Sequence, residues 1–159
     1  MKKIGLVGGI SWTSTIDYYR ILNERVNQKL GGLNFCECII YSVNFNDFVS
    51  NNVAGNWHLT LELMKNAANS LEKSGAEAIL LCANTAHAIA DELQTQINLP
   101  IINIIDETGK AIKAKGYSKA ALIGTQFTME MDFYRDGLAK FGIEMTVPKD
   151  QETRDFIQK

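Results

Sequence analysis

The fold of this chain is organised around residues 78–87, which read AILLCANTAH. The first four residues form a continuous apolar run shortly after Gly75, a pattern typical of a buried parallel strand. Asn84 and Thr85 then favour the start of a helix, whose apolar positions recur near helical spacing. We therefore expect Cys82 at the carboxyl end of a parallel strand, where open α/β sheets bind their ligands.

The position of Cys82 between a strand and a helix suggests a reactive thiol. The free amides and the positive end of a helix favour an anion, so the sequence predicts that the pKa of this thiol lies below the ~8.5 of a free cysteine. The alternative is that Cys82 is a small buried apolar residue, as cysteine often is in protein cores.

The bulk composition describes an ordinary globular protein: 159 residues, of which 46% are hydrophobic and 21% are charged. A net charge of −2 without a basic patch argues against nucleic acid or membrane surfaces as partners. No apolar run approaches the ~18 residues of a membrane span. Three cysteines argue against a disulfide framework and favour the cytoplasm. Cys36 and Cys38 have no second cysteine pair, so we expect no metal and predict that both are buried in a strand.

Strand-like and helix-like segments alternate along the chain. Strands are expected at residues 3–7, 35–43, 78–81, 100–105, 120–123 and 143–147. Helices are expected at residues 14–30, 57–74, 86–97, 107–115 and 128–141, and from residue 150 onward. Residues 44–56 are polar and predict a long loop, and Ser14-x-x-Asp17 predicts a capping box. The alternation indicates right-handed βαβ units and an α/β fold of parallel sheets, flavodoxin-like or Rossmann-like.

A shift of the chain by 115 positions aligns part of it with itself. Gly9 falls on Gly124, and residues 17–20 (DYYR) fall on residues 132–135 (DFYR). Each copy is a strand, a glycine turn and a helix, so the sequence predicts a duplication that gives two similar lobes. We place the first lobe at residues 1–105 and an incomplete second lobe at residues 106–159, with a ligand site in the cleft between such lobes.

Four segments, in the right order and spacing, resemble the aspartate/glutamate racemase superfamily, especially its broad-specificity amino-acid racemase branch. They are residues 4–15 (IGLVGGISWTST), 42–45 (SVNF), 82–87 (CANTAH) and 122–130 (LIGTQFTME). Proteins of this kind have two pseudo-symmetric lobes with one cysteine from each, and they need neither pyridoxal phosphate nor a metal. The resemblance implies that this chain corresponds to roughly the first two thirds of such a protein and ends before the second-cysteine motif.

The resemblance also implies a reaction, because racemisation removes a proton from one face of a Cα and returns one to the other face. Cys82 is implied as one of two acid/base cysteines, and the substrate is implied to be an amino acid. The implied substrate-binding residues are Ile10, Ser11, Ser42, Asn44, Ala83, Asn84, Thr85 and Thr125. Of these, Asn84 and Thr85 are expected to hold the substrate carboxylate.

Several of these residues also have purely structural explanations. Ser11 can cap the first helix and Asn84 the next one, while Ser42 and Asn44 can simply end a strand. His87 fits a structural role better than a catalytic one.

Two other functions therefore stay open. The chain can be a non-catalytic binder of small carboxylates or an inactive fragment, and it can belong to a cysteine-dependent decarboxylase or isomerase of the same superfamily. We also expect a homodimer, since Leu122, Ile143 and Val147 would lie on uncovered faces of an incomplete second sheet.

Overall fold

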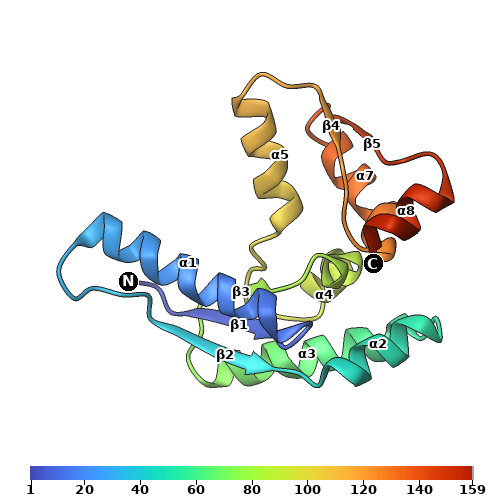
Figure 1. Ribbon diagram of the computed structural model, residues 1–159. Helices are drawn as coiled ribbons and strands as arrows, with labels where there is room; N and C mark the ends of the chain where they lie inside the picture. Colours follow the sequence, from blue (N-terminus) through green and yellow to red (C-terminus); the bar gives the residue numbers. More distant parts are fainter. Residues whose placement is uncertain (159) are drawn as a thin grey trace. The chain divides into compact units, whose positions relative to one another are not determined.

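The computed structural model describes residues 1–158 and divides the chain into two compact units, Met1–Ile102 and Asn103–Lys159. Each unit combines helices with an open sheet of parallel strands (Figure 1). The predicted α/β class with parallel sheets is therefore confirmed. In the part of the chain that is described, no helix is both long enough and apolar enough to cross a membrane.

The sheet of the first unit has the strand order β2-β1-β3. Its strands are β1 (Ile4–Gly8), β2 (Cys38–Ser42) and β3 (Ala78–Leu81). Both neighbours run parallel to β1, with Gly8 opposite Ser42 and Val7 opposite Leu81. The carboxyl ends of all three strands consequently meet at one edge of the sheet.

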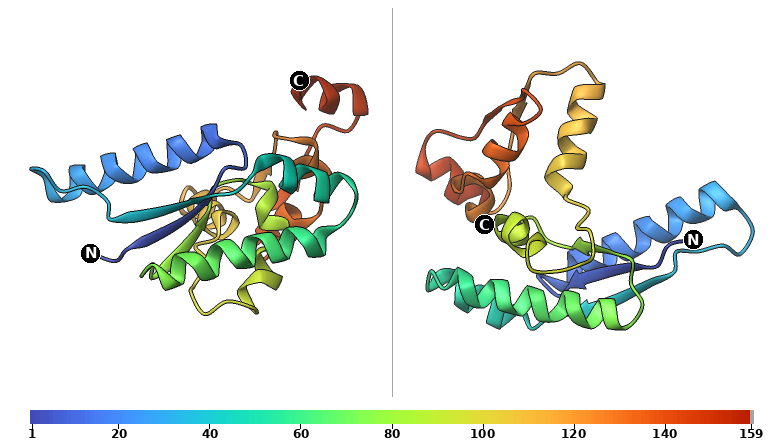
Figure 2. Two further views of the ribbon diagram at one scale, coloured as in Figure 1. Left: turned by 90° about the horizontal axis from the view of Figure 1, so that it is seen from below. Right: turned by 180° about the vertical axis from the view of Figure 1, so that it is seen from behind.

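Helices cover both faces of this sheet. Helix α1 (Trp12–Leu30) lies on one side and α3 (Trp57–Lys73) on the other, as the views in Figures 1 and 2 agree. The segment after β3 is a 3-10 helix, η1 (Thr85–Ile89), followed by the short α4 (Ala90–Gln94). The prediction of one continuous helix over residues 86–97 was wrong.

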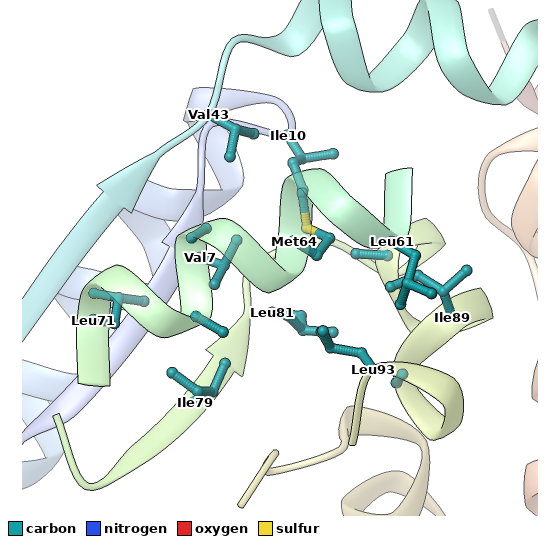
Figure 3. Close-up of a cluster of buried hydrophobic side chains, with 14 of the residues drawn as sticks. Val7, Ile10, Val43, Leu61, Met64, Leu71, Ile79, Leu81, Ile89 and Leu93 are labelled. Atoms are coloured by element: carbon teal, nitrogen blue, oxygen red, sulfur yellow. The ribbon is translucent and has the colours of Figure 1, made fainter. Parts of the chain in front are cut away.

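The core of the first unit lies between the sheet and α3, and Figure 3 shows its side chains. Val7, Ile79 and Leu81 point from the sheet toward Met64 and Leu71 of α3, and all five are at most 1% exposed. The apolar run before Cys82 is thus a buried strand, as its sequence pattern predicts.

The polar segment 44–56 is not a long loop, because it contains α2 (Phe45–Val53). The Asn44 side chain caps this helix by accepting a hydrogen bond from the Asn46 N–H (3.3 Å). Phe48, which is 3% exposed, anchors α2 in the core of the unit. The high asparagine content suggested a loop, although Asn44 caps a helix and Phe48 packs in the core.

Residues 100–105 form a single β-bridge, between Ile101 and Ile79, in place of the predicted fourth strand. Asn103 ends the extended segment because its side chain accepts a hydrogen bond from the Ile105 N–H (2.8 Å) and caps α5 (Ile104–Ala114). The last residues assigned to a strand are therefore the start of a helix.

The second unit contains α5 and a pair of parallel strands, β4 (Lys119–Ala121) and β5 (Glu144–Thr146). The helix predicted at residues 128–141 is interrupted at Met131, which gives α6 (Gln126–Glu130) and α7 (Phe133–Ala139). The final helix is α8 (Gln151–Gln158).

The second unit has a core of its own, which includes Ile105, Leu138 and Ile143. Ile143 is 3% exposed and Leu122 packs against the same cluster, so the expectation that these two side chains lie on an uncovered face was wrong. Val147 is also partly buried.

Candidate active site

Three loops leave the carboxyl edge of the first unit's sheet. They are the segments that follow β1, β2 and β3, at residues 9–11, 43–44 and 82–84. The register brings them together, since Gly8 lies opposite Ser42 and the Cys82 N–H donates to the Val7 carbonyl (2.9 Å). All of the predicted site residues except Thr125 therefore lie at or next to one sheet edge, the usual place for ligands in open α/β sheets.

Cys82 is the first residue after β3, and its side chain is fully buried. Its sulfur lies 4.0 Å from the Leu80 carbonyl oxygen, so the thiol turns back along its own strand. The N–H and the carbonyl of Cys82 both form hydrogen bonds, which hold its backbone in place.

The start of α1 is bound to this edge by Ser14 and Thr15. The Ser14 Oγ donates to the Cys82 carbonyl oxygen (2.7 Å) and also lies 3.0 Å from the Ser11 carbonyl oxygen. Thr15, which is buried, accepts a hydrogen bond from the Gly9 N–H (3.0 Å). The predicted capping box is absent, because Ser11 and not Ser14 occupies the cap position of the helix.

Sequence reasoning missed this role of Ser14, which connects the first loop to the third. The sequence shows only a serine near the start of a helix that follows a glycine turn. Its partner, the Cys82 carbonyl, can be identified only from the parallel register of β1 and β3.

The hydrogen bond from Ser14 to Cys82 gives a testable stability effect. We expect Ser14→Ala to lower the free energy of unfolding by about 1 kcal/mol, because the Cys82 carbonyl loses its side-chain donor. The matched control is Ser70→Ala, since the Ser70 Oγ donates within its own helix to Asn66; a change below about 0.5 kcal/mol is expected there. Urea unfolding of both variants measures the difference, and equal values would contradict the assignment.

The second loop contributes two exposed polar residues. Ser42 is the last residue of β2, and Asn44 is the cap of α2. Asn44 therefore has the structural role that the sequence left open, and its exposure leaves its amide accessible as well. Ile10, in the first loop, is 5% exposed and belongs to the core, and the substrate contact expected for it stays a prediction.

The third loop is stabilised from within. The His87 Nδ1 donates to the Ala83 carbonyl oxygen (3.0 Å), and the His87 N–H donates to the Asn84 carbonyl oxygen (2.9 Å). Asn84 is exposed, whereas Thr85 is 9% exposed. His87 thus has the structural role that the sequence favoured, and Asn84 is the polar side chain of this loop that faces solvent.

Thr125 belongs to the second unit, where it caps α6. Its Oγ1 lies 2.9 Å from the Thr128 Oγ1 and accepts from the Thr128 N–H (3.4 Å). The substrate contact expected for Thr125 stays a prediction.

Comparison with known proteins agrees with this arrangement, because the family described as Asp/Glu/Hydantoin racemase matches residues 7–159. The chain belongs to this family. The broad specificity amino-acid racemase RacX of Bacillus subtilis is 36% identical over 78 residues, which cover 49% of this chain and 34% of RacX. This racemase-family chain thus aligns with about a third of that curated relative.

Solved structures of the family match over more of the chain. A presumed Asp/Glu racemase of Yersinia pestis has 43% identity and a TM-score of 0.93, and the match covers 99% of this chain and 69% of that one. An aspartate racemase homologue of Pyrococcus horikoshii has 38% identity and a TM-score of 0.88, with the same two coverages. The α/β units described above are therefore the architecture of this racemase family.

The acidity of Cys82 differs from the sequence-based prediction for this family member. Burial is the main cause that raises the pKa of the Cys82 thiol to about 12, and the charge of a Cys38 thiolate raises it further. The predicted lowering was wrong because the thiol is shielded from water and is followed by a five-residue 3-10 helix rather than a long α-helix. Cys82 is consequently a neutral thiol near pH 7.

The other two cysteines of this racemase-family chain lie at the amino end of β2, whereas Cys82 follows the carboxyl end of β3. Cys38 begins β2 and pairs in register with Ile4, the first residue of β1. Cys36 precedes the strand, and both residues are partly exposed, so the prediction that both are buried in a strand was wrong. Within residues 1–158, no cluster of three or more His, Cys, Asp or Glu is placed to hold a metal.

Proposed function

We propose that this chain contributes one half of the acid/base machinery of a cofactor-independent amino-acid racemase, with Cys82 as the proton-carrying group. The observation that supports it is the position of Cys82 at the edge where three parallel strands end, in a chain that belongs to a racemase family. The exposed amides of Asn44 and Asn84 supply hydrogen-bond donors at the same edge, suited to a substrate carboxylate.

The neutral state of Cys82 fits one of the two roles that racemisation requires. The reaction needs one thiolate, which accepts the proton from Cα, and one thiol, which donates a proton to the opposite face. A buried thiol with a raised pKa serves as the donor: the S–H bond breaks, the new Cα–H bond forms, and the sulfur keeps the electron pair. Because the sulfur is fully buried here, we propose that the loop of residues 82–84 shifts when substrate binds.

The second acid/base group must come from outside the set of cysteines in this chain. Cys36 and Cys38 lie at the amino end of β2, whereas Cys82 follows the carboxyl end of β3. The second unit contains no cysteine at all. We therefore propose that this chain protonates or deprotonates one face of the substrate only.

Hydrogen exchange at Cα tests this proposal directly. Aspartate and glutamate are the first probes, since both names occur among the relatives. In D₂O we expect the small thiolate fraction of Cys82 to remove the Cα proton of one enantiomer and to return a deuteron to the same face. The 159-residue chain should therefore exchange this hydrogen without inversion, as detected by NMR, at a rate that rises with pH. Cys82→Ser should lower this rate by about 100-fold or more, because a hydroxyl is a far poorer proton carrier. The matched control is Cys36→Ser, which should leave the rate unchanged.

The same experiment separates the alternatives. Saturable binding of either amino acid without any exchange would support a non-catalytic carboxylate binder. Release of carbon dioxide from a dicarboxylate would support a decarboxylase of the family. Exchange that survives Cys82→Ser would contradict the assigned role of Cys82 in either enzyme.

A further inference from the structure

Cys36 and Cys38 flank Glu37 at the start of β2, the edge strand of the first unit. Burial raises the pKa of both thiols, and the Cys36 Sγ donates to the Glu37 carbonyl oxygen (3.8 Å). Both residues are partly exposed, so small molecules in solution can reach them. The proposed racemase chemistry uses neither sulfur.

The backbone around Glu37 holds both cysteines on one side of the chain. The Glu37 carbonyl accepts from the Ile4 N–H (3.1 Å), and its carboxylate forms an ion pair with Lys3 (3.0 Å). In extended chain the side chains on either side of such a residue point the same way, with Cα atoms about 6.6 Å apart. This Cα spacing lies at the upper end of the ~4.4–6.8 Å range found for disulfides, and the chain has to bend to bring the Cβ atoms to the ~3.8 Å of a disulfide.

The segment can also adjust to form such a bond. Cys36 lies outside the strand ladder, and its N–H is held by a side chain, the Asn23 Oδ1 (3.0 Å), rather than by a neighbouring strand. β2 is an edge strand, so one of its sides has no neighbour in the sheet. A bend at residue 36 therefore disturbs one hydrogen bond to α1 and leaves the ladder from Cys38 onward in place.

We propose that Cys36 and Cys38 form a dithiol site that low-molecular-weight disulfides, such as glutathione disulfide, oxidise reversibly to an intramolecular disulfide. The Cys36 thiolate attacks one sulfur of glutathione disulfide, which forms a mixed disulfide and releases one glutathione thiolate. Cys38 then loses its proton to solvent and attacks the Cys36 sulfur, which releases the second glutathione. Two protein thiols are oxidised by two electrons, and one glutathione disulfide is reduced to two glutathione molecules.

The order of attack follows from where the two residues lie. Cys36 is the residue outside the ladder, where a bulky mixed disulfide meets less resistance. Cys38, the first residue of the regular pairing with β1, then resolves the intermediate from a fixed position.

A glutathione redox titration of the 159-residue chain tests the proposal. Trypsin releases residues 30–65 as one peptide that contains Cys36 and Cys38 but not Cys82, so its mass reports this site alone. We expect this peptide to lose two hydrogens and to resist N-ethylmaleimide. Diluting total glutathione at a fixed oxidised-to-reduced ratio should raise the ratio of disulfide to dithiol about tenfold for a tenfold dilution, because two glutathione molecules are released for each glutathione disulfide consumed.

Two single variants decide whether the second cysteine resolves the adduct. Cys36→Ser and Cys38→Ser should each give only a glutathione adduct, whose amount does not change on dilution. The proposal is overturned if the native peptide carries glutathione adducts or two maleimides, or if its ratio of disulfide to dithiol does not change on dilution.

Discussion

Gly9→Ala is expected to lower the free energy of unfolding of the first unit by about 3 kcal/mol. Gly9 has a φ of +88°, which costs an L side chain about 1–2 kcal/mol. A Cβ at this position would also press on the Val43 carbonyl oxygen and lie 2.7 Å from the Ser42 Oγ and 2.8 Å from the Val43 nitrogen. The first two loops at the sheet edge would therefore have to separate.

Gly55→Ala separates the two causes. Gly55 also has a positive φ, +70°, but a Cβ there would meet nothing within 4 Å. We expect a cost of about 1 kcal/mol for this variant, from backbone strain alone. Urea unfolding followed by circular dichroism measures both variants. Equal losses would show that the contact between the first two loops does not matter to stability.

The stability of the first unit should also fall steeply between pH 9 and pH 12. Burial raises the pKa of Cys82 from 9.0 to about 12, so above pH 9 the folded chain retains a proton that the unfolded chain has released. Stability is then lost as the pH rises, at about 1.4 kcal/mol per pH unit and about 4 kcal/mol over the whole range. Below pH 9 both states bind the proton, and the contribution is constant.

Cys82→Ala isolates this effect from the other groups that titrate in alkaline solution. Removal of the buried sulfur should cost about 1 kcal/mol at pH 8, because it leaves a small cavity. Near pH 10.5 the order should reverse, since the variant has no buried thiol that resists ionisation. Urea unfolding at several pH values gives the two stability curves. Parallel curves would mean that Cys82 ionises normally in the folded protein.

Several features of the fold could be predicted from short stretches of sequence. The apolar run before Cys82 gave the buried strand β3, and the four-residue periodicity that ends at Gly31 gave the long helix α1. The predictions that were wrong concerned residues that are typical of more than one kind of structure. Asn44 and Asn103 indicated loop or strand, yet each caps a helix, because an asparagine favours a turn and a cap through the same hydrogen bond to a backbone N–H.

The sequence predicted which residues gather at the candidate site, but not the hydrogen bonds and the burial of the Cys82 thiol there. The βα alternation places the three loops at one edge, since parallel strands share a direction. Neither the Ser14 hydrogen bond to Cys82 nor the depth of the thiol is visible in the order of residues. The pKa prediction failed for that reason, because desolvation depends on which atoms surround the sulfur.

The sequence by itself determined the α/β class, the strand that carries Cys82 and the edge of the sheet where this cysteine lies, because hydrophobic periodicity and strand polarity are local properties. The tertiary structure decided whether the Cys82 thiol is charged. Its charge depends on which atoms surround the sulfur, and in this fold water is excluded from it.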